Sequence, residues 1–191
     1  MFDRIVGAFT FRKGVYAEVE QDQSFTQSAW LLVAVVAFLA QLGANVGASS
    51  IVGWLVGSVI GTVFAVAGFA GAAFVISWVG RSLFKATTDF SEMVRVLGLA
   101  YVWNVVGFLG ILGLLGRLDC IVAPIGIVAW ILGLIAWAVA AKEALDLDWV
   151  QTIITIILGF IVVMIVTFIA GLVLAALGFA AAGIGGVFSG Q

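Results

Sequence analysis

The chain has no histidine, one cysteine and one proline among its 191 residues. The lack of histidine excludes the commonest general base and most zinc sites. A lone cysteine, Cys120, can form no disulfide within the chain and cannot hold an iron–sulfur cluster. The sequence also lacks a nucleophile paired with a base, and a Gly-rich loop ending in Lys-Ser or Lys-Thr that would bind phosphate. We therefore predict no catalytic residues, no cofactor and no metal ion.

Charged residues are also scarce. Only 9% of the residues are charged, 64% are hydrophobic, and the mean hydropathy is +1.30. A soluble domain of this size needs a polar shell, which so few charges cannot supply. The net charge of −2 and the absence of a large basic patch argue against nucleic acid as a partner. The composition instead indicates a chain whose main partner is a lipid bilayer.

Long apolar runs take up most of the chain. A helix needs about 20 residues to cross a hydrocarbon layer of roughly 30 Å, and runs such as WLLVAVVAFLA lack the alternation of a barrel strand. Helices satisfy every backbone polar group inside lipid, so we predict an all-α integral membrane bundle of five transmembrane helices. The predicted spans are Ala29–Gly47, Ile51–Gly80, Met93–Leu115, Ile121–Ala141 and Trp149–Gly171, the last with a possible extension to Gly178. This divides the chain into an N-terminal amphipathic segment (1–28), a transmembrane domain (29–178) and a Gly/Ala-rich tail (179–191).

The positive charges orient this bundle. With five spans, seven of the eight Lys and Arg residues fall on one side of the membrane and only Arg117 on the other. Cytoplasmic segments carry the excess of Lys and Arg, so the N-terminus is predicted to be cytoplasmic and the C-terminus outside. Recognition by charged groups is then expected at residues 1–28 and 81–95. The basic residues of these segments are Arg4, Arg12, Lys13, Arg81, Lys85 and Arg95.

The N-terminal segment contains a helical pattern of its own. Phe2, Ile5, Val6 and Phe9 recur at the spacing of one helix face, and basic residues lie nearby. This pattern is typical of a helix lying in the membrane interface. The alternative is a short tail packed on the bundle.

Glycines four apart, or three apart, mark expected sites of close helix packing. Small residues at this spacing form a groove in which another helix backbone can come close. The partner helix could belong to the same chain or to a second copy. The expected packing glycines are Gly43, Gly47, Gly53, Gly57, Gly61, Gly107 and Gly110.

Few polar side chains lie inside the predicted spans. Asn104 falls near the middle of the third span and shares a face with Tyr101, and a buried amide should face the bundle and find a partner. Gln41 and Asn45 lie four apart near the outer end of the first span. These four side chains either bond to neighbouring helices or line a cavity. Asp89, followed three residues later by a Glu, resembles a capping box and predicts the start of the third helix.

Two segments carry a family resemblance. FRKGVYAEVEQDQSFTQSAWLLVAVVAFLAQLGA and DFSEMVRVLGLAYVWNVVGFLG are similar to the approaches to the first and third spans in short prokaryotic members of the Ypt-interacting-protein (Yip) domain family. The matching positions of the second segment are Phe90, Leu97, Gly98 and Tyr101. Eukaryotic relatives bind Rab-type GTPases in vesicle traffic, but their acidic-Leu-Tyr-Gly-Pro motif is absent here. The resemblance implies a five-span fold in a membrane, here the prokaryotic cytoplasmic membrane, and an adaptor-like role.

Two functions remain open at this stage. The first is a non-enzymatic Yip-like scaffold or adaptor, or an accessory subunit of a membrane complex, whose partners are other membrane proteins or copies of itself. The alternative is a transporter or channel for a small neutral or apolar solute. Its path would be lined by Gln41, Asn45, Tyr101 and Asn104.

Overall fold

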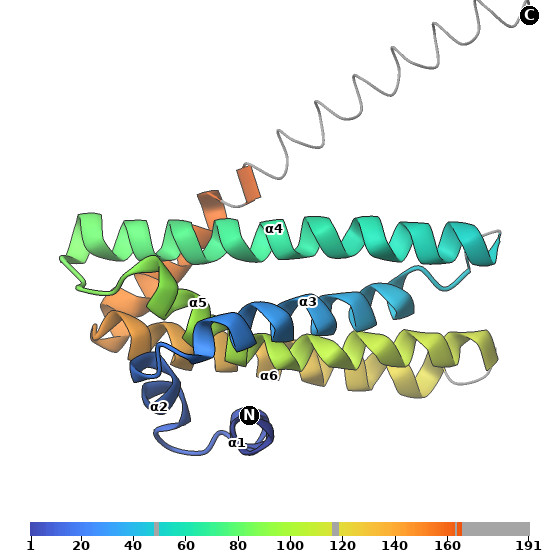
Figure 1. Cartoon of the computed structure of the whole chain (residues 1–191), viewed down its shortest axis with the longest axis horizontal. Helices are drawn as coiled ribbons and strands as arrows, with labels where there is room; N and C mark the ends of the chain where they lie inside the picture. Colours follow the sequence, from blue (N-terminus) through green and yellow to red (C-terminus); the bar gives the residue numbers. More distant parts are fainter. Residues whose placement is uncertain (48–49, 116–118, 163, 166–191) are drawn as a thin grey trace, which may run out of the picture.

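The computed structural model describes residues 1–47, 50–115, 119–162 and 164–165, and every regular element in this part of the chain is helical (Figure 1). Two short helices precede four long helical spans. The elements are α1 (Phe2–Phe9), α2 (Val15–Gln21), α3 (Phe25–Ala44), α4 (Ile51–Phe84), α5 (Phe90–Ala100), the 3₁₀ helix η1 (Tyr101–Leu115), α6 (Asp119–Leu145) and a shorter apolar helix, Trp149–Val162.

Four helices are long and apolar enough to cross a membrane, which confirms the prediction of a helical membrane bundle. They are Phe25–Ala44, Ile51–Phe84, Phe90–Leu112 and Val122–Leu145. The described part of the fifth predicted span, Trp149–Val162, is apolar but shorter. The remainder of that span and the tail 179–191 lie outside the described residues.

The boundaries differ from the predicted ones mainly at the end of the bundle that the charge pattern predicts to be cytoplasmic, hereafter the cytoplasmic end. Helix α3 begins at Phe25, four residues before the predicted span, and α4 continues to Phe84 beyond Gly80. The apolar runs identify the part of each helix inside lipid, whereas the helices themselves continue into water until a cap ends them. Helices α1 and α2 lie within the predicted N-terminal segment 1–28, and its last four residues form the first turn of α3.

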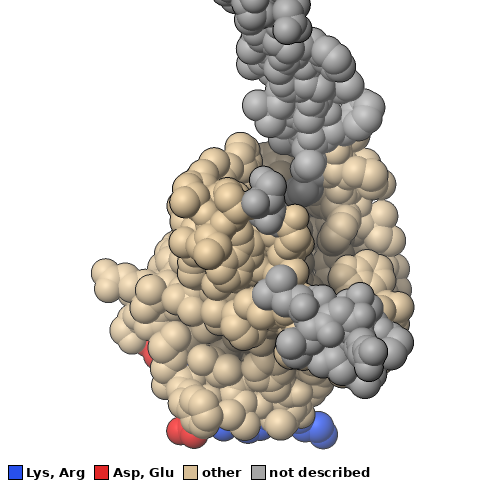
Figure 2. Space-filling view, turned by 90° about the vertical axis from the view of Figure 1, so that its right-hand side faces the viewer, with Lys and Arg blue, Asp and Glu red and all other residues tan. Residues whose placement is uncertain are grey.

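The long helices run side by side, and the third span lies between the first and the fourth (Figure 1). Helix α3 packs against α4 on one side and against α5 and η1 on the other, while α6 packs on the far side of η1. Helix α2 contacts α5 and α6 at the cytoplasmic end. The space-filling view from the end where α4 begins is nearly free of charged atoms, which appear only at its margin (Figure 2).

The core lies in the cytoplasmic half of the bundle. All residues from Met93 to Ala100 of α5 are buried, because α2, α3, α4 and α6 surround this helix. Aromatic rings extend the core along the spans. The Phe69 ring lies 5.7 Å from Trp30, 5.4 Å from Tyr101 and 6.4 Å from Trp137, and so joins four spans.

Candidate functional site: the cytoplasmic polar network and the intramembrane polar contacts

The third span begins at the predicted capping box, which the structure confirms. The Asp89 carboxylate accepts from the Glu92 backbone N–H at 2.7 Å, and the Glu92 carboxylate accepts from the Asp89 N–H at 2.9 Å. The bond from the Glu92 N–H holds the pKa of Asp89 below its usual value, and the Ser91 hydroxyl adds to this effect. The cap fixes where α5 starts and therefore where Arg95 points.

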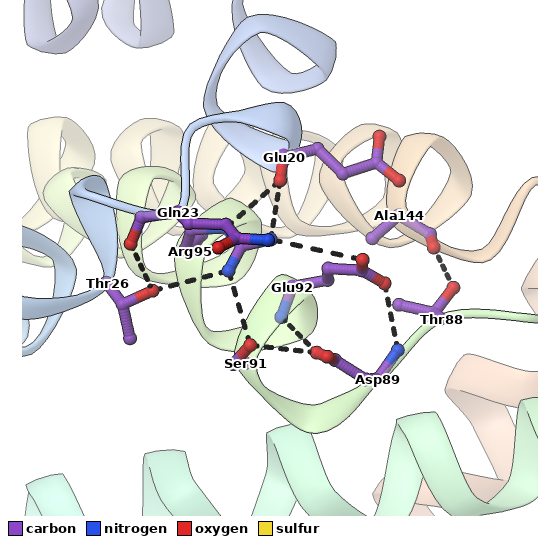
Figure 3. A network of polar contacts seen from close by, with 9 residues as sticks. All are labelled: Glu20, Gln23, Thr26, Thr88, Asp89, Ser91, Glu92, Arg95 and Ala144. Atoms are coloured by element: carbon purple, nitrogen blue, oxygen red, sulfur yellow. Dashed lines mark hydrogen bonds and ion pairs between the residues drawn. The ribbon is translucent and has the colours of Figure 1, made fainter.

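Arg95 is the centre of the cytoplasmic network (Figure 3). Its Nε and Nη2 donate to the backbone carbonyl of Glu20 at 3.0 and 2.6 Å. Its Nη1 donates to the Thr26 hydroxyl at 3.3 Å and to the Ser91 hydroxyl at 3.2 Å, and the Glu92 carboxylate lies 4.0 Å from Nη2. One guanidinium thus ties the end of α2, the first turn of α3 and α5 together.

The exposure of Arg95 differs from the sequence-based expectation. We predicted a basic residue on the cytoplasmic surface, but its side chain is only 4% exposed and its donors face protein groups. The predicted span Met93–Leu115 already included this position, between two valines, and that was the signal for burial. Glu20 and Thr26, its partners, were not identified from the sequence because they lie 75 and 69 residues away along the chain.

Acidic groups gather beside this network. The carboxylate of Glu20 is partly buried, and burial raises its pKa to about 7, with further contributions from the negative charges of Asp146, Glu92 and Glu143. The positive charge of Arg95 opposes the shift only weakly, because the guanidinium binds the Glu20 carbonyl rather than its carboxylate. The Thr88 hydroxyl donates to the Ala144 carbonyl and closes the network onto α6 (Figure 3).

Two of the predicted basic residues form ion pairs within the N-terminal segment. Arg4 bonds to Asp22 at 2.7 Å and Arg12 to Glu18 at 2.6 Å. The hydrogen bond from Ser24, and then that from Arg4, keep the pKa of Asp22 below its usual value. The first pair joins α1 to the residue that ends α2. The second joins the loop after α1 to α2 itself.

The remaining predicted basic residues, Lys13, Arg81 and Lys85, are exposed. Arg81 donates from Nε to the Ser77 carbonyl of its own helix at 3.3 Å. Lys85 ends α4 in the left-handed conformation, with φ of 58°. These three residues, unlike Arg95, keep the surface position expected from the sequence.

Three of the predicted packing glycines do bring two helices together inside the membrane. A Cβ at Gly43 would collide with the backbone carbonyl of Gly107, and a Cβ at Gly110 would lie 2.6 Å from the Gly43 carbonyl oxygen. A 3₁₀ helix has three residues per turn, so Gly107 and Gly110 lie in one row along η1. This row is the groove in which the α3 backbone sits.

Two further glycines of α4 accommodate side-chain amides. A Cβ at Gly61 would collide with the Gln41 side chain, and a Cβ at Gly57 would lie 3.4 Å from Oδ1 of Asn45. Asn45 also donates to the Gln41 backbone carbonyl at 2.9 Å. These amides were predicted either to bond to a neighbouring helix or to line a cavity. The structure shows them in contact with the neighbouring helix α4.

Polar groups of α4 complete this contact with α3. The Trp54 indole donates to the Leu42 carbonyl at 2.9 Å, and the Ser58 hydroxyl lies 3.2 Å from the Gln41 carbonyl. Neither was identified from the sequence, because both reach α3 across the turn that joins the two helices.

Gly47 and Gly53 do not pack against another helix as predicted. Gly47 has a φ of 101°, and no atom lies within 4 Å of the place that a Cβ would take, so it serves the turn after α3. A Cβ at Gly53 would meet only the Ser50 hydroxyl, 3.1 Å away, which caps the start of α4. Gly47 thus lies in the outer turn, and Gly53 in the first turn of α4.

Asn104 does not face the bundle as predicted. In the described part of the chain its side chain is exposed, and it donates to the Tyr101 carbonyl, three residues earlier, at 3.1 Å. Tyr101 itself packs on Phe69. The four polar residues proposed to line a path therefore divide into two groups, Gln41 and Asn45 at α4, and Tyr101 with Asn104 on η1.

The described residues contain no cluster of His, Cys, Asp and Glu able to hold a metal ion. Many of their polar side chains form caps, ion pairs and contacts between helices, whereas the Tyr16 hydroxyl, the Trp103 indole N–H and the Thr155 hydroxyl are buried without a hydrogen-bond partner in this part of the chain. What this arrangement can do is hold segments in fixed positions and present a charged cytoplasmic surface.

The comparison with protein families decides which fold family this is. The family model described as the Yip1 domain matches residues 6–171. The chain belongs to the Yip1 domain family. No curated protein and no solved structure matches the chain.

The Yip1 domain match covers the Arg95 network and both glycine contacts. The positions that carried the resemblance are packing residues in this Yip1 domain. Leu97 is fully buried, a Cβ at Gly98 would lie 3.1 Å from Cβ of Ala29, and the Phe90 ring lies 6.4 Å from Trp30. Together they seat α5 of the Yip1 domain against α3.

Proposed function

We propose that this Yip1 domain protein is a non-enzymatic scaffold or adaptor of the prokaryotic cytoplasmic membrane, and that its cytoplasmic end binds another membrane-associated protein. The observation that supports it best is the Arg95 network, which joins α2, α3 and α5 into one cap. A surface already held in place loses less conformational entropy on binding, which favours recognition of a partner.

The lack of histidine agrees with this proposal. The carboxylate of Asp89 caps α5, and the hydroxyl next to it, that of Ser91, donates to this carboxylate and accepts from Arg95. A transporter role has less support, because the four polar residues expected to line one path are divided. Gln41 and Asn45 contact α4, whereas Asn104 bonds to Tyr101 on η1. The family membership supports a membrane protein with protein partners.

The proposal is tested by photo-crosslinking in native membranes. A photoreactive residue at Thr87 or Gln27, both exposed at the cytoplasmic end, should yield a discrete crosslinked complex, whereas one at Val59, which is 54% exposed on α4, should yield mainly lipid adducts. Mass spectrometry of the complex then identifies the partner chain. Native mass spectrometry showing a solitary chain, with no crosslink at Thr87 or Gln27, would overturn the proposal.

A further inference from the structure

Helix α1 lies across the long helices. In Figure 1 it is seen nearly end-on, whereas the spans run across the picture. Its Phe9 ring lies 5.0 Å from the Trp103 ring in an edge-to-face contact, and the Phe11 ring lies 5.8 Å from the same indole. Because Trp103 belongs to the apolar span Phe90–Leu112, α1 rests on the flank of the bundle and not on its end.

The length of α4 indicates the depth of this contact. A helix of 34 residues is about 51 Å long, about 20 Å more than the hydrocarbon layer. Seven of the eight Lys and Arg residues belong to segments on the side where α4 meets α5, so we place the excess length on that side. Trp103 is about 22 Å from the start of α5, given the rise of α and 3₁₀ helices. Helix α1 therefore lies near the boundary between headgroups and acyl chains.

The two faces of α1 differ in what covers them. Ile5 and Phe9 pack against the core, and Ala8 is fully buried. Met1, Phe2 and Val6 are 53%, 76% and 42% exposed. Large apolar side chains exposed at this depth meet lipid, because a helix in the membrane interface with an apolar outer face gains free energy by inserting it among acyl chains.

The positive charges next to α1 also agree with a position at the membrane surface. Arg12 and Lys13 follow the helix and are exposed, and Lys13 has no ion-pair partner among the described residues. Cations beside an apolar helix face attract anionic headgroups. We propose that α1 is an in-plane lipid anchor, with Phe2 and Val6 among the acyl chains of the cytoplasmic leaflet and Lys13 at anionic headgroups.

The anchor is tested on the full chain reconstituted into vesicles of phosphatidylcholine and phosphatidylglycerol. In a Cys120→Ser background, an environment-sensitive fluorophore is attached at Phe2→Cys or, as the matched control one residue on, at Asp3→Cys. We expect brominated acyl chains to quench the label at position 2 at least about threefold more than at position 3, as for the buried face of an interfacial helix. Aqueous iodide should show the reverse preference.

Equal access of iodide to both labels would overturn the proposal. Dilution to one chain per vesicle should leave the quenching at position 2 unchanged, whereas its loss on dilution would show that a second copy covers this face. Omitting phosphatidylglycerol should weaken the quenching, and Lys13→Gln should reduce that dependence. Quenching independent of the anionic lipid would overturn the role given to Lys13. The assignment does not depend on the scaffold proposal.

Discussion

The guanidinium of Arg95 is a buried charge whose hydrogen-bond acceptors are all neutral groups. Burying a charge costs several kcal/mol unless hydrogen bonds replace its hydration. Here the Glu20 carbonyl and two hydroxyls accept from it, and the carboxylate of Glu92 is 4.0 Å away. Arg95 therefore links α5 to α2 and α3, and its role is to position α2.

Removing the Arg95 side chain should weaken the packing of α2 and α3 on α5 at the cytoplasmic end. We expect Arg95→Met to lower the free energy of unfolding by about 3 kcal/mol, because the Glu20 carbonyl and the Thr26 hydroxyl lose their donors in a buried site. Equilibrium unfolding in mixed micelles measures the change. Lys85→Gln, which alters an exposed cation, should change the free energy by less than about 0.5 kcal/mol. Equal effects of the two substitutions would contradict the structural role of Arg95.

The pKa of Glu20 predicts a pH dependence of stability. Because its folded pKa is raised from 4.5 to about 7, the folded state retains this proton more strongly than the unfolded state, and stability should fall as pH rises from about 4.5 through 7. The group is partly exposed, so we expect a loss of about 1 kcal/mol. Glu20→Gln should flatten the midpoint temperature between pH 5 and pH 8, whereas Glu18→Gln on the same helix should not. A profile unchanged by Glu20→Gln would contradict this assignment.

At the scale of elements, the features that the sequence predicts are the local ones. Asp89 and Glu92 are three residues apart, so their capping box follows from spacing alone, and the spans follow from runs of apolar residues. The partners of Arg95, and the contact of Gln41 with Gly61, depend on how helices rotate and pair. That geometry is set by packing across the whole bundle, which composition and spacing do not encode.

The contact between α3 and η1 should be sensitive to a single methyl group. We expect Gly43→Ala to lower the free energy of unfolding by about 1–3 kcal/mol, because the added Cβ meets the rigid carbonyl of Gly107 and the helices must separate. Gly68→Ala is the matched control, since a Cβ there meets nothing within 4 Å and alanine favours the helix. Unfolding in mixed micelles should show the control to be neutral or stabilised. Tolerance of Gly43→Ala would show that the close approach is unused.

At the scale of the whole molecule, the charge asymmetry predicts an orientation that labelling can check. In a Cys120→Ser background, Ser50→Cys at the start of α4 should react with a membrane-impermeant maleimide in intact cells. Thr87→Cys, in the loop between α4 and α5, should react only after permeabilisation. The reverse pattern would show that the N-terminus is outside.

The 3₁₀ geometry of η1 makes the third span longer than an α-helix of the same residues would be. Its 15 residues rise about 30 Å at 2.0 Å each, whereas an α-helix of the same residues would rise about 22 Å. Changing the hydrogen bonds from i→i+3 to i→i+4 would thus shorten the span by about 8 Å. It would also offset Gly110 from Gly107 by about 60° around the helix axis, because three residues of an α-helix cover about 300°. The close contact of Gly43 with both glycines therefore fits the 3₁₀ pitch, in which Gly107 and Gly110 face α3 one directly after the other.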